Sequence, residues 1–565
     1  MKKLIAAFLL TASGVLVWMP APSFAQSSSD TLYVSALPPG NLNNVIAGDT
    51  TAAGERKDPN RVYVLQQTGS FDTTYFWTAT INMLSNWNLT IVGKNNPVTG
   101  MPPVVEPYIL ADNSTPVRLT ECRAGNISVK NIYFLDSRTD GLISAGDSRF
   151  FDGTPVGATL RIDHCVFDDF TRGQGALISY GGDTNSFYIT NCEFRNIQAQ
   201  ADFQTPIMFA EDADTIECVN NTFFCIGQDA IWGNDWLGYL LFDHNTILGD
   251  AQIPLHIYQV DTATIENNIF YGTYAWGLDS NAIKSGGIGN DPPAVINFDS
   301  LLQFSEPPYY LTEAGRHIMV RNNAYYWPNG VDSTISAIDD TAKDYVVSPT
   351  WMDSLTTAMF SDHSVWPGLS ESSNDNVDPG YSASITGPMV SSLDSFTVEH
   401  WDGTIATSPL WRQFITNPNS VFGPVKKNWA SVQGYAVPEN LAYSNASLQT
   451  MGSDGKPLGD LNWYPSLLAV NEPPEAIADK FTLSQNYPNP FNPSTEIKVV
   501  LNKPGAMSLR IYNILGQEVK VIDQGSKPEG SYTYNVNMDK YASGVYFYTL
   551  RQGSSMLTRK MILLK

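Results

Sequence analysis

The chain has 565 residues, in which 56 aspartate and glutamate residues outnumber 33 lysine and arginine residues, for a formal net charge of −23. This excess argues against nucleic acid or an anionic membrane surface as a partner, because both would be repelled, and it fits solubility or cation binding better. The five cysteines show no CxxC and no zinc-like spacing, so neither a zinc site nor a disulfide scaffold is expected.

Residues 1–25 are predicted to be a Sec signal peptide. Two lysines precede an apolar run over residues 4–17, and Ser23-Phe24-Ala25 supplies a small-residue cleavage site. The run is too short for a membrane span, and no later segment approaches ~20 apolar residues. We therefore expect an exported, soluble protein that starts near Gln26 and has no membrane span.

An eight-residue pattern recurs through the first 325 residues. It appears as "ISVKNIYF", "LRIDHCVF", "FYITNCEF", "IECVNNTF", "LLFDHNTI", "ATIENNIF" and "IMVRNNAY", with "LTIVGKNN" as an earlier, degenerate copy. The central apolar residues of the copies are Ile91, Val129, Ile162, Ile189, Cys218, Phe242, Ile265 and Val320. The long last step from 265 to 320 indicates a skipped copy or an insertion around "SGGIGNDPPAV".

Each copy predicts a short strand with one face inward, because apolar residues alternate along it. Two residues past the central position comes an asparagine or histidine that tolerates a left-handed turn, and we expect these side chains to stack inward from copy to copy. These residues are Asn131, His164, Asn191, Asn220, His244, Asn267 and Asn322. Cys165 and Cys192 share one slot in adjacent copies, where a disulfide is geometrically possible, and they are expected to pack as free thiols. The steps are too short and variable for propeller blades, and the leucines of a leucine-rich repeat are missing, so stacked β-coils fit best.

The copies "LRIDHCVF", "LLFDHNTI" and "ATIENNIF" resemble the rungs of right-handed parallel β-helix proteins of the pectate-lyase-like group. The resemblance implies an all-β solenoid over residues 26–326, with an N-terminal cap and an opening strand in "RVYVLQQTGSF". It does not choose a reaction, because this fold carries lyases, hydrolases, epimerases, adhesins and phage tailspikes.

Residues 327–468 lack the repeat pattern and are expected to be a loop-rich extension or a C-terminal cap of the β-helix, since the last rung of a solenoid needs a cover. Residues 469–480, "AVNEPPEAIADK", are charged, contain prolines and have no periodicity. They are predicted to be a linker.

Residues 481–565 are predicted to be a small Ig-like β-sandwich, because short alternating segments ("EIKVVL", "MSLRIYNIL", "GSYTYNVN", "ASGVYFYTL", "TRKMILLK") are separated by turns. Together with "NYPNPF", "LRIYNILGQEV" and the terminal "RKMILLK", they resemble the type A C-terminal sorting domain of the type IX secretion system. The resemblance implies Sec export to the periplasm, recognition by the outer-membrane translocon, and a passenger released or held at the cell surface. The alternative is an ordinary Ig-like spacer or carbohydrate-binding module.

Any chemistry of the passenger should lie on outward strand positions, where we name three acids and three bases. By analogy with β-helix polysaccharide lyases, the acids could hold Ca²⁺ against a uronate carboxylate while a basic residue takes a proton or clamps the sugar. The acids are Asp163, Asp243 and Glu266, and the bases are Lys130, Arg161 and Arg321. Plain solvated surface is the competing interpretation, because outward positions of any solenoid are polar.

Two functions stay open on the sequence. The first is a secreted or cell-surface protein, a monomer, that binds extracellular polysaccharide, with an anionic one favoured, and cleaves it as a lyase or hydrolase. The second is a non-catalytic adhesin or coat protein on the same scaffold. The sequence does not fix a cofactor, a metal site or the glycan.

Overall fold

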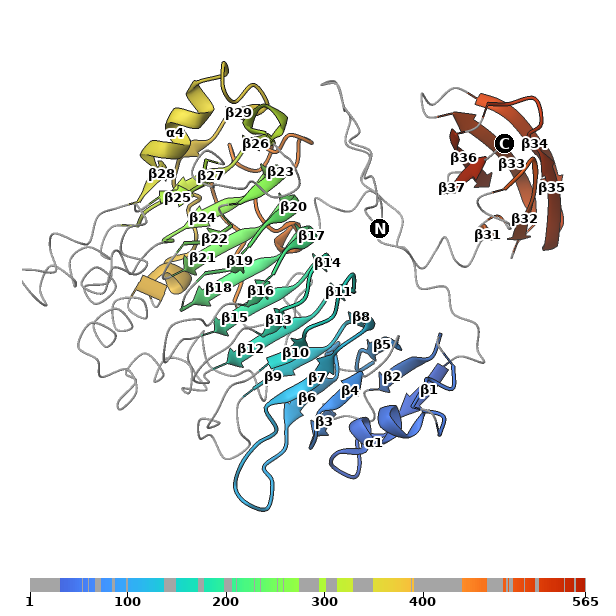
Figure 1. The fold of residues 1–565 in the computed structure, drawn as a ribbon, viewed down its shortest axis with the longest axis horizontal. Coiled ribbons are helices and arrows are strands. Elements are labelled where there is room, and N and C mark those ends of the chain that lie inside the picture. The colour runs from blue at the N-terminus through green and yellow to red at the C-terminus, as the bar shows by residue number, and fades with distance from the viewer. Residues whose placement is uncertain are drawn as a thin grey trace, which may run out of the picture. The chain divides into compact units, whose positions relative to one another are not determined.

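Figure 1 shows the fold in a computed structural model of the chain. The structure describes residues 31–464 and 481–563, apart from 53, 59, 67–72, 84–86, 98–99, 137–148, 171–176, 198–205, 210, 228, 234, 251–252, 258, 274–293, 301–311, 329–348, 388, 391–438, 484–485, 487–490, 502–503, 514–517, 543 and 553–554. The predicted signal peptide and linker therefore lie outside the described residues. The chain divides into two compact units, Met1–Pro465 and Ser466–Lys565.

The first unit is built from long parallel sheets. Within the described residues, an eleven-stranded sheet contains β1 (Thr31–Val34), β2 (Val62–Gln66), β5 (Trp87–Lys94), β8 (Gly125–Lys130), β11 (Thr159–Asp163), β14 (Asn185–Thr190), β17 (Ala213–Val219), β20 (Leu237–Asp243), β23 (Val260–Glu266), β26 (His317–Arg321) and β29 (Leu369–Ser372). A ten-stranded sheet contains β3 (Thr74–Trp77), β6 (Val104–Pro107), β9 (Tyr133–Leu135), β12 (Val166–Phe170), β15 (Glu193–Ile197), β18 (Thr222–Ile226), β21 (Thr246–Asp250), β24 (Ile269–Tyr271), β27 (Ala324–Tyr326) and β30 (Asp375–Asn376).

A seven-stranded sheet completes the solenoid. It contains β4 (Ile81–Met83), β7 (Arg118–Cys122), β10 (Arg149–Gly153), β13 (Ile178–Tyr180), β16 (Ile207–Phe209), β19 (Ile231–Gly233) and β22 (Leu255–His256), and a separate parallel pair is formed by β25 (Ala294–Ile296) and β28 (Thr350–Met352). The chain takes one strand in the seven-stranded sheet, one in the eleven-stranded sheet and one in the ten-stranded sheet before it repeats, as in β7, β8 and β9. The predicted parallel β-helix is thus confirmed.

The predicted turn after each strand of the eleven-stranded sheet is confirmed. All seven named asparagine and histidine residues have a positive φ between 52° and 61°. This left-handed conformation costs an asparagine less than most other residues, which is why asparagine recurs there. The long last step holds an insertion and no skipped rung of this sheet, because β23 pairs directly with β26.

The predicted inward direction of these turn residues is wrong, although Asn220 Nδ2 does donate to Asn191 Oδ1 of the adjacent copy at 2.7 Å. The inward ladder lies one residue later, where Asn221, Asn245, Asn268 and Asn323 each donate through Nδ2 to Oδ1 of the next asparagine at 2.9–3.1 Å, ending at Asn374. The reason is geometric: the left-handed residue turns the chain, and the residue after it points into the coil. His164 is accordingly exposed, whereas His244 is buried.

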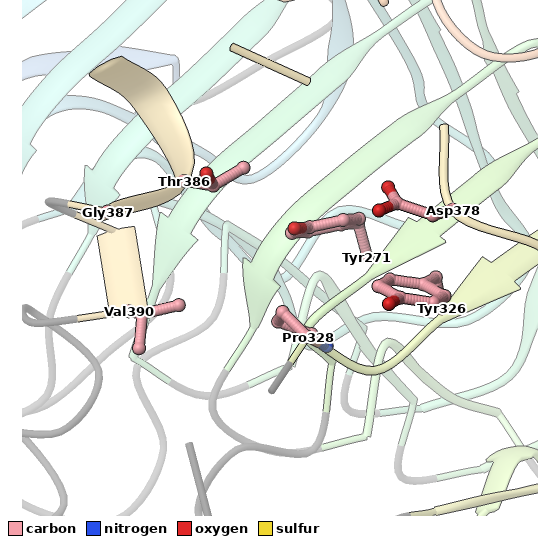
Figure 2. Close-up of a pocket in the computed structure, with 7 residues that line it drawn as sticks. All are labelled: Tyr271, Tyr326, Pro328, Asp378, Thr386, Gly387 and Val390. Atoms are coloured by element: carbon pink, nitrogen blue, oxygen red, sulfur yellow. The ribbon is translucent and has the colours of Figure 1, made fainter. Parts of the chain in front are cut away.

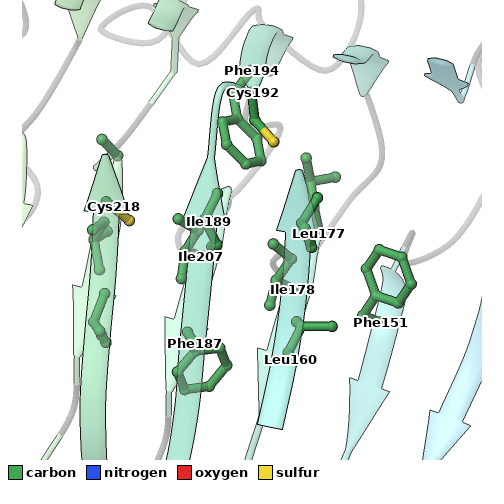
Figure 3. Packing of buried hydrophobic residues seen from close by; sticks show 14 of the residues in the cluster. Phe151, Leu160, Leu177, Ile178, Phe187, Ile189, Cys192, Phe194, Ile207 and Cys218 are labelled. Carbon is green, nitrogen blue, oxygen red and sulfur yellow. The ribbon is translucent and has the colours of Figure 1, made fainter. Parts of the chain in front are cut away.

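The interior is filled by columns of equivalent residues from successive coils. Phe134, Phe167, Phe194 and Phe223 stack with ring centroids 4.9–5.1 Å apart. Figure 3 shows Phe194, Cys192 and Ile189 with other buried residues of this core. Their spacing is close to the ~4.8 Å between strands, so each coil contributes one ring to the column. All five cysteines are free and buried, as expected.

Elements outside the repeats also join the core. Helix α1 (Asn41–Gly48) buries Leu42 and Ile46, and helix α4 (Ser354–Ser361) buries Met359 and Phe360. Two short 3₁₀ helices, η4 (Glu313–Gly315) and η6 (Leu461–Trp463), lie in the later part of this unit. The described parts of 327–468 thus include a core helix as well as the flanking segments considered below.

The second unit has two antiparallel sheets, as the sandwich prediction requires. One contains β31 (Phe481–Leu483), β32 (Ser494–Leu501) and β35 (Gly530–Asn537), and the other contains β34 (Glu518–Lys527), β33 (Gly505–Asn513), β36 (Gly544–Gln552) and β37 (Ser555–Leu563). Strand β34 was not predicted, because only a turn was expected in that part of the sequence. Asn486 of the asparagine- and proline-rich stretch is buried, where its backbone N–H donates to Tyr548 Oη at 2.7 Å.

Candidate functional site

The six predicted site residues lie on the eleven-stranded sheet. One register column runs through Lys130, Asp163, Thr190, Val219, Asp243, Glu266 and Arg321. Arg161 lies two residues before Asp163, in the neighbouring outward column, with its guanidinium 3.9 Å from the ring centroid of Tyr188. The strand register therefore agrees with the sequence-based assignment of these positions.

The carboxylate of Asp163 is fully engaged by its neighbours. Lys130 Nζ lies 2.7 Å from Oδ2, and His164 Nδ1, Thr190 Oγ1 and Asn191 Nδ2 lie 2.7–3.0 Å from Oδ1. Burial opposes ionisation, but the hydrogen bonds and charges of His164 and Lys130 outweigh it and hold the pKa of Asp163 well below its usual range. A carboxylate held this way stabilises the turn, and it would have to give up these contacts to bind a ligand.

Glu266 and Arg321 form a pair beneath a later segment of the chain. Arg321 Nε lies 2.7 Å from Glu266 Oε2, and Ser453 Oγ donates to the same oxygen at 2.9 Å. Only 2% of Glu266 is exposed. We expected an open acidic face here; residues around Ser453 instead cover it, and the repeat pattern gives no sign of that contact.

Asp243 is also largely enclosed. It accepts a hydrogen bond from Asn267 Nδ2 at 2.8 Å. Burial raises the pKa of Asp243, the nearby carboxylates of Glu266 and Asp454 raise it further, and His244 opposes the shift. Asp243 is therefore harder to ionise than Asp163, although both occupy the same column.

The predicted residues do not converge on one point. Asp243, Glu266 and Arg321 lie on consecutive strands, but three strand spacings, about 14 Å, separate Asp243 from Asp163. Among the residues that the structure describes, no group of three or more His, Cys, Asp or Glu side chains is placed to hold a metal ion. The catalytic role of the six residues stays a prediction.

The outer face of the ten-stranded sheet is covered by the flanking segment, residues 439–464. Leu441, Tyr443, Leu458 and Trp463 of this segment pack in one buried cluster with outward residues of the sheet such as Phe224. Trp463 Nε1 also donates to Thr222 Oγ1 at 2.9 Å. This part of 327–468 therefore packs along the side of the β-helix.

A buried charge cluster fixes the start of the flanking segment. Arg195 is fully buried, with Nε and Nη2 at 2.6 and 2.9 Å from the carboxylate oxygens of Glu439 and Nη1 at 2.6 Å from Asp168 Oδ2. The Tyr133 hydroxyl donates to the same oxygen of Asp168. Burial raises the pKa of neighbouring Glu193 well above its usual range, and the charge of Glu439 adds to the shift.

A pocket of about 320 Å³ opens beside this covered area. The described residues that line it are Tyr271, Tyr326, Pro328, Asp378, Thr386, Gly387 and Val390. Figure 2 shows the two tyrosine rings next to the Asp378 carboxylate, with Thr386 and Val390 on the other side. The ring centroids of Tyr271 and Tyr326 are 5.8 Å apart, at an angle of 31°.

Neighbouring coils supply the two tyrosines. β24 and β27 are paired in register, and because Phe270 points into the core, Tyr271 and its partner Tyr326 point outward. Burial raises the pKa of Tyr271, and the negative charge of Asp378 raises it further, so its hydroxyl stays protonated. The pocket thus offers aromatic faces, a phenol and a carboxylate.

Sequence reasoning missed this pocket. The signal was present as the outward residue that follows the re-entering aromatic in "NNIFY" and "NNAYY". Outward positions were considered only on the first strand of each copy. Apart from Pro328, the remaining lining residues come from a segment about 50 residues further along the chain, with no pattern of its own.

A second group that the sequence analysis missed lies on the seven-stranded sheet. Trp232 and His256 are register partners with ring centroids 6.1 Å apart. Buried Asp229 lies with Oδ2 3.4 Å from His256 Nδ1, and the backbone N–H of Ile253 donates to Oδ1 at 3.1 Å. Burial raises the pKa of Asp229, and His256 opposes the shift. A partly exposed aromatic ring and an oriented imidazole therefore share this face.

Comparison with known proteins identifies the C-terminal unit. Residues 485–564 match the secretion system C-terminal sorting domain. The fold and this domain together define an exported parallel β-helix protein. Residues 485–564 are therefore a type IX secretion sorting domain, which directs the protein to the cell surface or the extracellular space.

Other comparisons say little about the passenger. A search of curated proteins finds no match. Among solved structures, the FMN-binding beta-glucuronidase from Facaelibacterium prausnitzii L2-6 is 12% identical over 44% of this chain, with a TM-score of 0.12. The match spans 36% of that chain, and a score this low supports no argument about fold or activity. No helix within the described ranges is long and apolar enough to cross a membrane.

Proposed function

We propose that the passenger is a secreted glycan-binding protein whose binding site is the tyrosine pocket, defined here as Tyr271, Tyr326, Asp378 and the residues around them. The observation that carries the proposal is the pair of tilted tyrosine rings beside a carboxylate in a cavity of about 320 Å³. Sites for small ligands are typically concave, about 300–1,000 Å³, mainly apolar, and supplied with a few polar groups. Tyrosine adds a flat apolar face for a sugar ring and a hydroxyl for its oxygens.

The charged residues of the eleven-stranded sheet are poorly placed to catalyse cleavage, which favours a binding function over an enzymatic one. Asp163 is saturated with hydrogen bonds, and Glu266 is paired and covered, so neither carboxylate is poised for proton transfer. A binding protein requires only exposed aromatic and polar groups in a groove. The same pocket would serve a non-catalytic adhesin.

The experiment compares Tyr326→Ala with a matched tyrosine elsewhere. The purified protein is titrated with neutral, anionic and cationic polysaccharides by calorimetry. Tyr326→Ala should weaken the interaction at least about tenfold, since a stacked aromatic contributes on the order of 1 kcal/mol beyond its buried area. Tyr33→Ala removes an exposed tyrosine of β1 and should leave affinity unchanged. Equal affinity for both variants would reject the pocket as the site.

Polysaccharide cleavage is the second candidate, favoured by the Asp229–His256 pair beside Trp232. A carboxylate beside Nδ1 orients a neutral imidazole, whose Nε2 could then act as a base toward a substrate proton. New reducing ends or unsaturated products that appear with the wild-type protein and disappear in His256→Gln would support cleavage. If the polymers stay intact under all conditions, cleavage is rejected and binding remains as the proposed function.

A further inference from the structure

The described lining of the tyrosine pocket is unbalanced in charge. It contains the Asp378 carboxylate and neither lysine nor arginine. Asp378 is exposed, and its Oδ1 accepts a hydrogen bond from the backbone N–H of Gly380 at 2.8 Å, which holds the side chain in place. No ion pair to Asp378 is present among the described residues, so its charge is available to a ligand.

The strand next to the pocket adds negative charge. Asp375 on β30 is exposed, and its register partner on β27, Ala324, lies in the same cluster as Tyr271. Arg321, at the end of β26, is paired with Glu266 at 2.7 Å. With a net charge of −23 for the whole chain, the local field repels uronates and attracts cations.

We propose that the tyrosine pocket recognises a protonated amino sugar, so that the ligand is a glycan with free amino groups. The inference rests on the proposed glycan-binding function and specifies its substrate class. The ammonium group would lie against the face of the partly exposed Tyr326, which packs on buried Tyr271, and pair with Asp378, while the sugar ring covers the rest of the cavity. Aromatic faces attract cations electrostatically, and a charged hydrogen bond adds to this attraction.

An amino sugar fits the pocket better than the side chain of a basic peptide. The cavity is large enough for a ring, and Thr386 and Val390 lie opposite the tyrosines, so polar and apolar contacts are available on both sides. A lysine ammonium on a flexible stem would use the carboxylate and leave most of this volume empty. The peptide is therefore the competing ligand that the experiment must distinguish.

The experiment titrates the full chain with chito-oligosaccharides of one length, either fully deacetylated or fully acetylated, and with oligolysine of equal charge. We expect the deacetylated form to bind at least about tenfold more tightly than the acetylated form, and less tightly as salt is raised. Asp378→Asn should weaken binding of the deacetylated oligosaccharide about tenfold. Asp112→Asn, which deletes an equally exposed carboxylate outside the pocket, is the matched control.

The outcomes distinguish failure of the amino-sugar specificity from failure of glycan binding itself. Equal binding of both oligosaccharides, with loss in Tyr326→Ala, overturns the amino-sugar specificity while glycan binding stands. Oligolysine binding that matches or exceeds that of the deacetylated oligosaccharide also overturns it. If neither these nor neutral and anionic glycans bind the wild-type protein, the proposed function fails.

Discussion

Removing Glu439 should release the flanking segment from the β-helix. Glu439 accepts two hydrogen bonds from Arg195, at 2.6 and 2.9 Å, and both side chains are fully buried. Glu439→Ala would leave the guanidinium with Asp168 as its remaining short carboxylate contact at 2.6 Å. The charge would be only partly compensated in a region closed to water.

The expected cost is about 3–5 kcal/mol in the free energy of unfolding of the first unit, which is typical when one partner of a buried ion pair is removed. The cavity left by the missing carboxylate adds to the cost. Because Tyr443 and Trp463 pack on the same side of the sheet, loosening should spread along residues 439–464. Binding at the tyrosine pocket should weaken as well.

The assay is urea unfolding of the full chain followed by tryptophan fluorescence, with limited proteolysis to locate the opened segment. The two units can unfold separately, so the transition of the first unit is fitted on its own. Glu371→Ala, which removes an exposed glutamate, is the control and should cost less than about 0.5 kcal/mol. If the Glu439→Ala protein is as stable and protease-resistant as the control, the Arg195–Glu439 pair does not hold the flanking segment on the β-helix.

Four further changes test the fold and its electrostatics. Asp163→Asn should remove stability above the unfolded pKa of 3.8 and flatten its loss in acid, because the folded pKa is lower and the stabilisation disappears as pH falls through it; unfolding midpoints at several pH values check this. Glu193 has a raised pKa in the folded state, so it costs stability as pH rises above the unfolded value of 4.5. Glu193→Gln should remove that loss, and an unchanged slope of stability against pH above 4.5 would contradict it. Phe194→Ala deletes one ring of the core column and should cost about 3–5 kcal/mol in the same unfolding assay, whereas a cost below about 1 kcal/mol would argue against tight stacking. Asn268→Ala removes the acceptor of the Asn245 N–H and Nδ2 groups and should cost roughly 2–4 kcal/mol, with faster amide exchange at Asn245 as the specific readout.

The repeat made the β-helix predictable. Alternating apolar residues and a turn residue that accepts a left-handed backbone are both local features. A segment such as "LRIDHCVF" therefore predicts its strand and turn without knowledge of distant residues. The last coil was missed because β29 buries only Leu369 and exposes Ser370, Glu371 and Ser372, so it shows no alternation. The asparagine ladder was predicted one residue too early, because the sequence "NN" does not indicate which asparagine turns the chain and which points inward.

The site was less predictable because it depends on contacts between distant segments. Outward register placed Lys130 beside Asp163, as their strand pairing confirms. Nothing in the repeats indicated that Ser453 would cover Glu266 or that Asp378 would lie beside Tyr271. Such partners are chosen by packing of chain segments outside the repeats, and composition alone does not reveal that packing.

The central claim is that this secreted β-helix binds a glycan at the tyrosine pocket. The most direct measurement is the affinity of the wild-type, Tyr326→Ala and Tyr33→Ala proteins for the glycan that binds best in the calorimetric panel. The account predicts a loss of at least about tenfold for Tyr326→Ala and none for Tyr33→Ala. Equal affinity in all three proteins, with the fold intact, would contradict it.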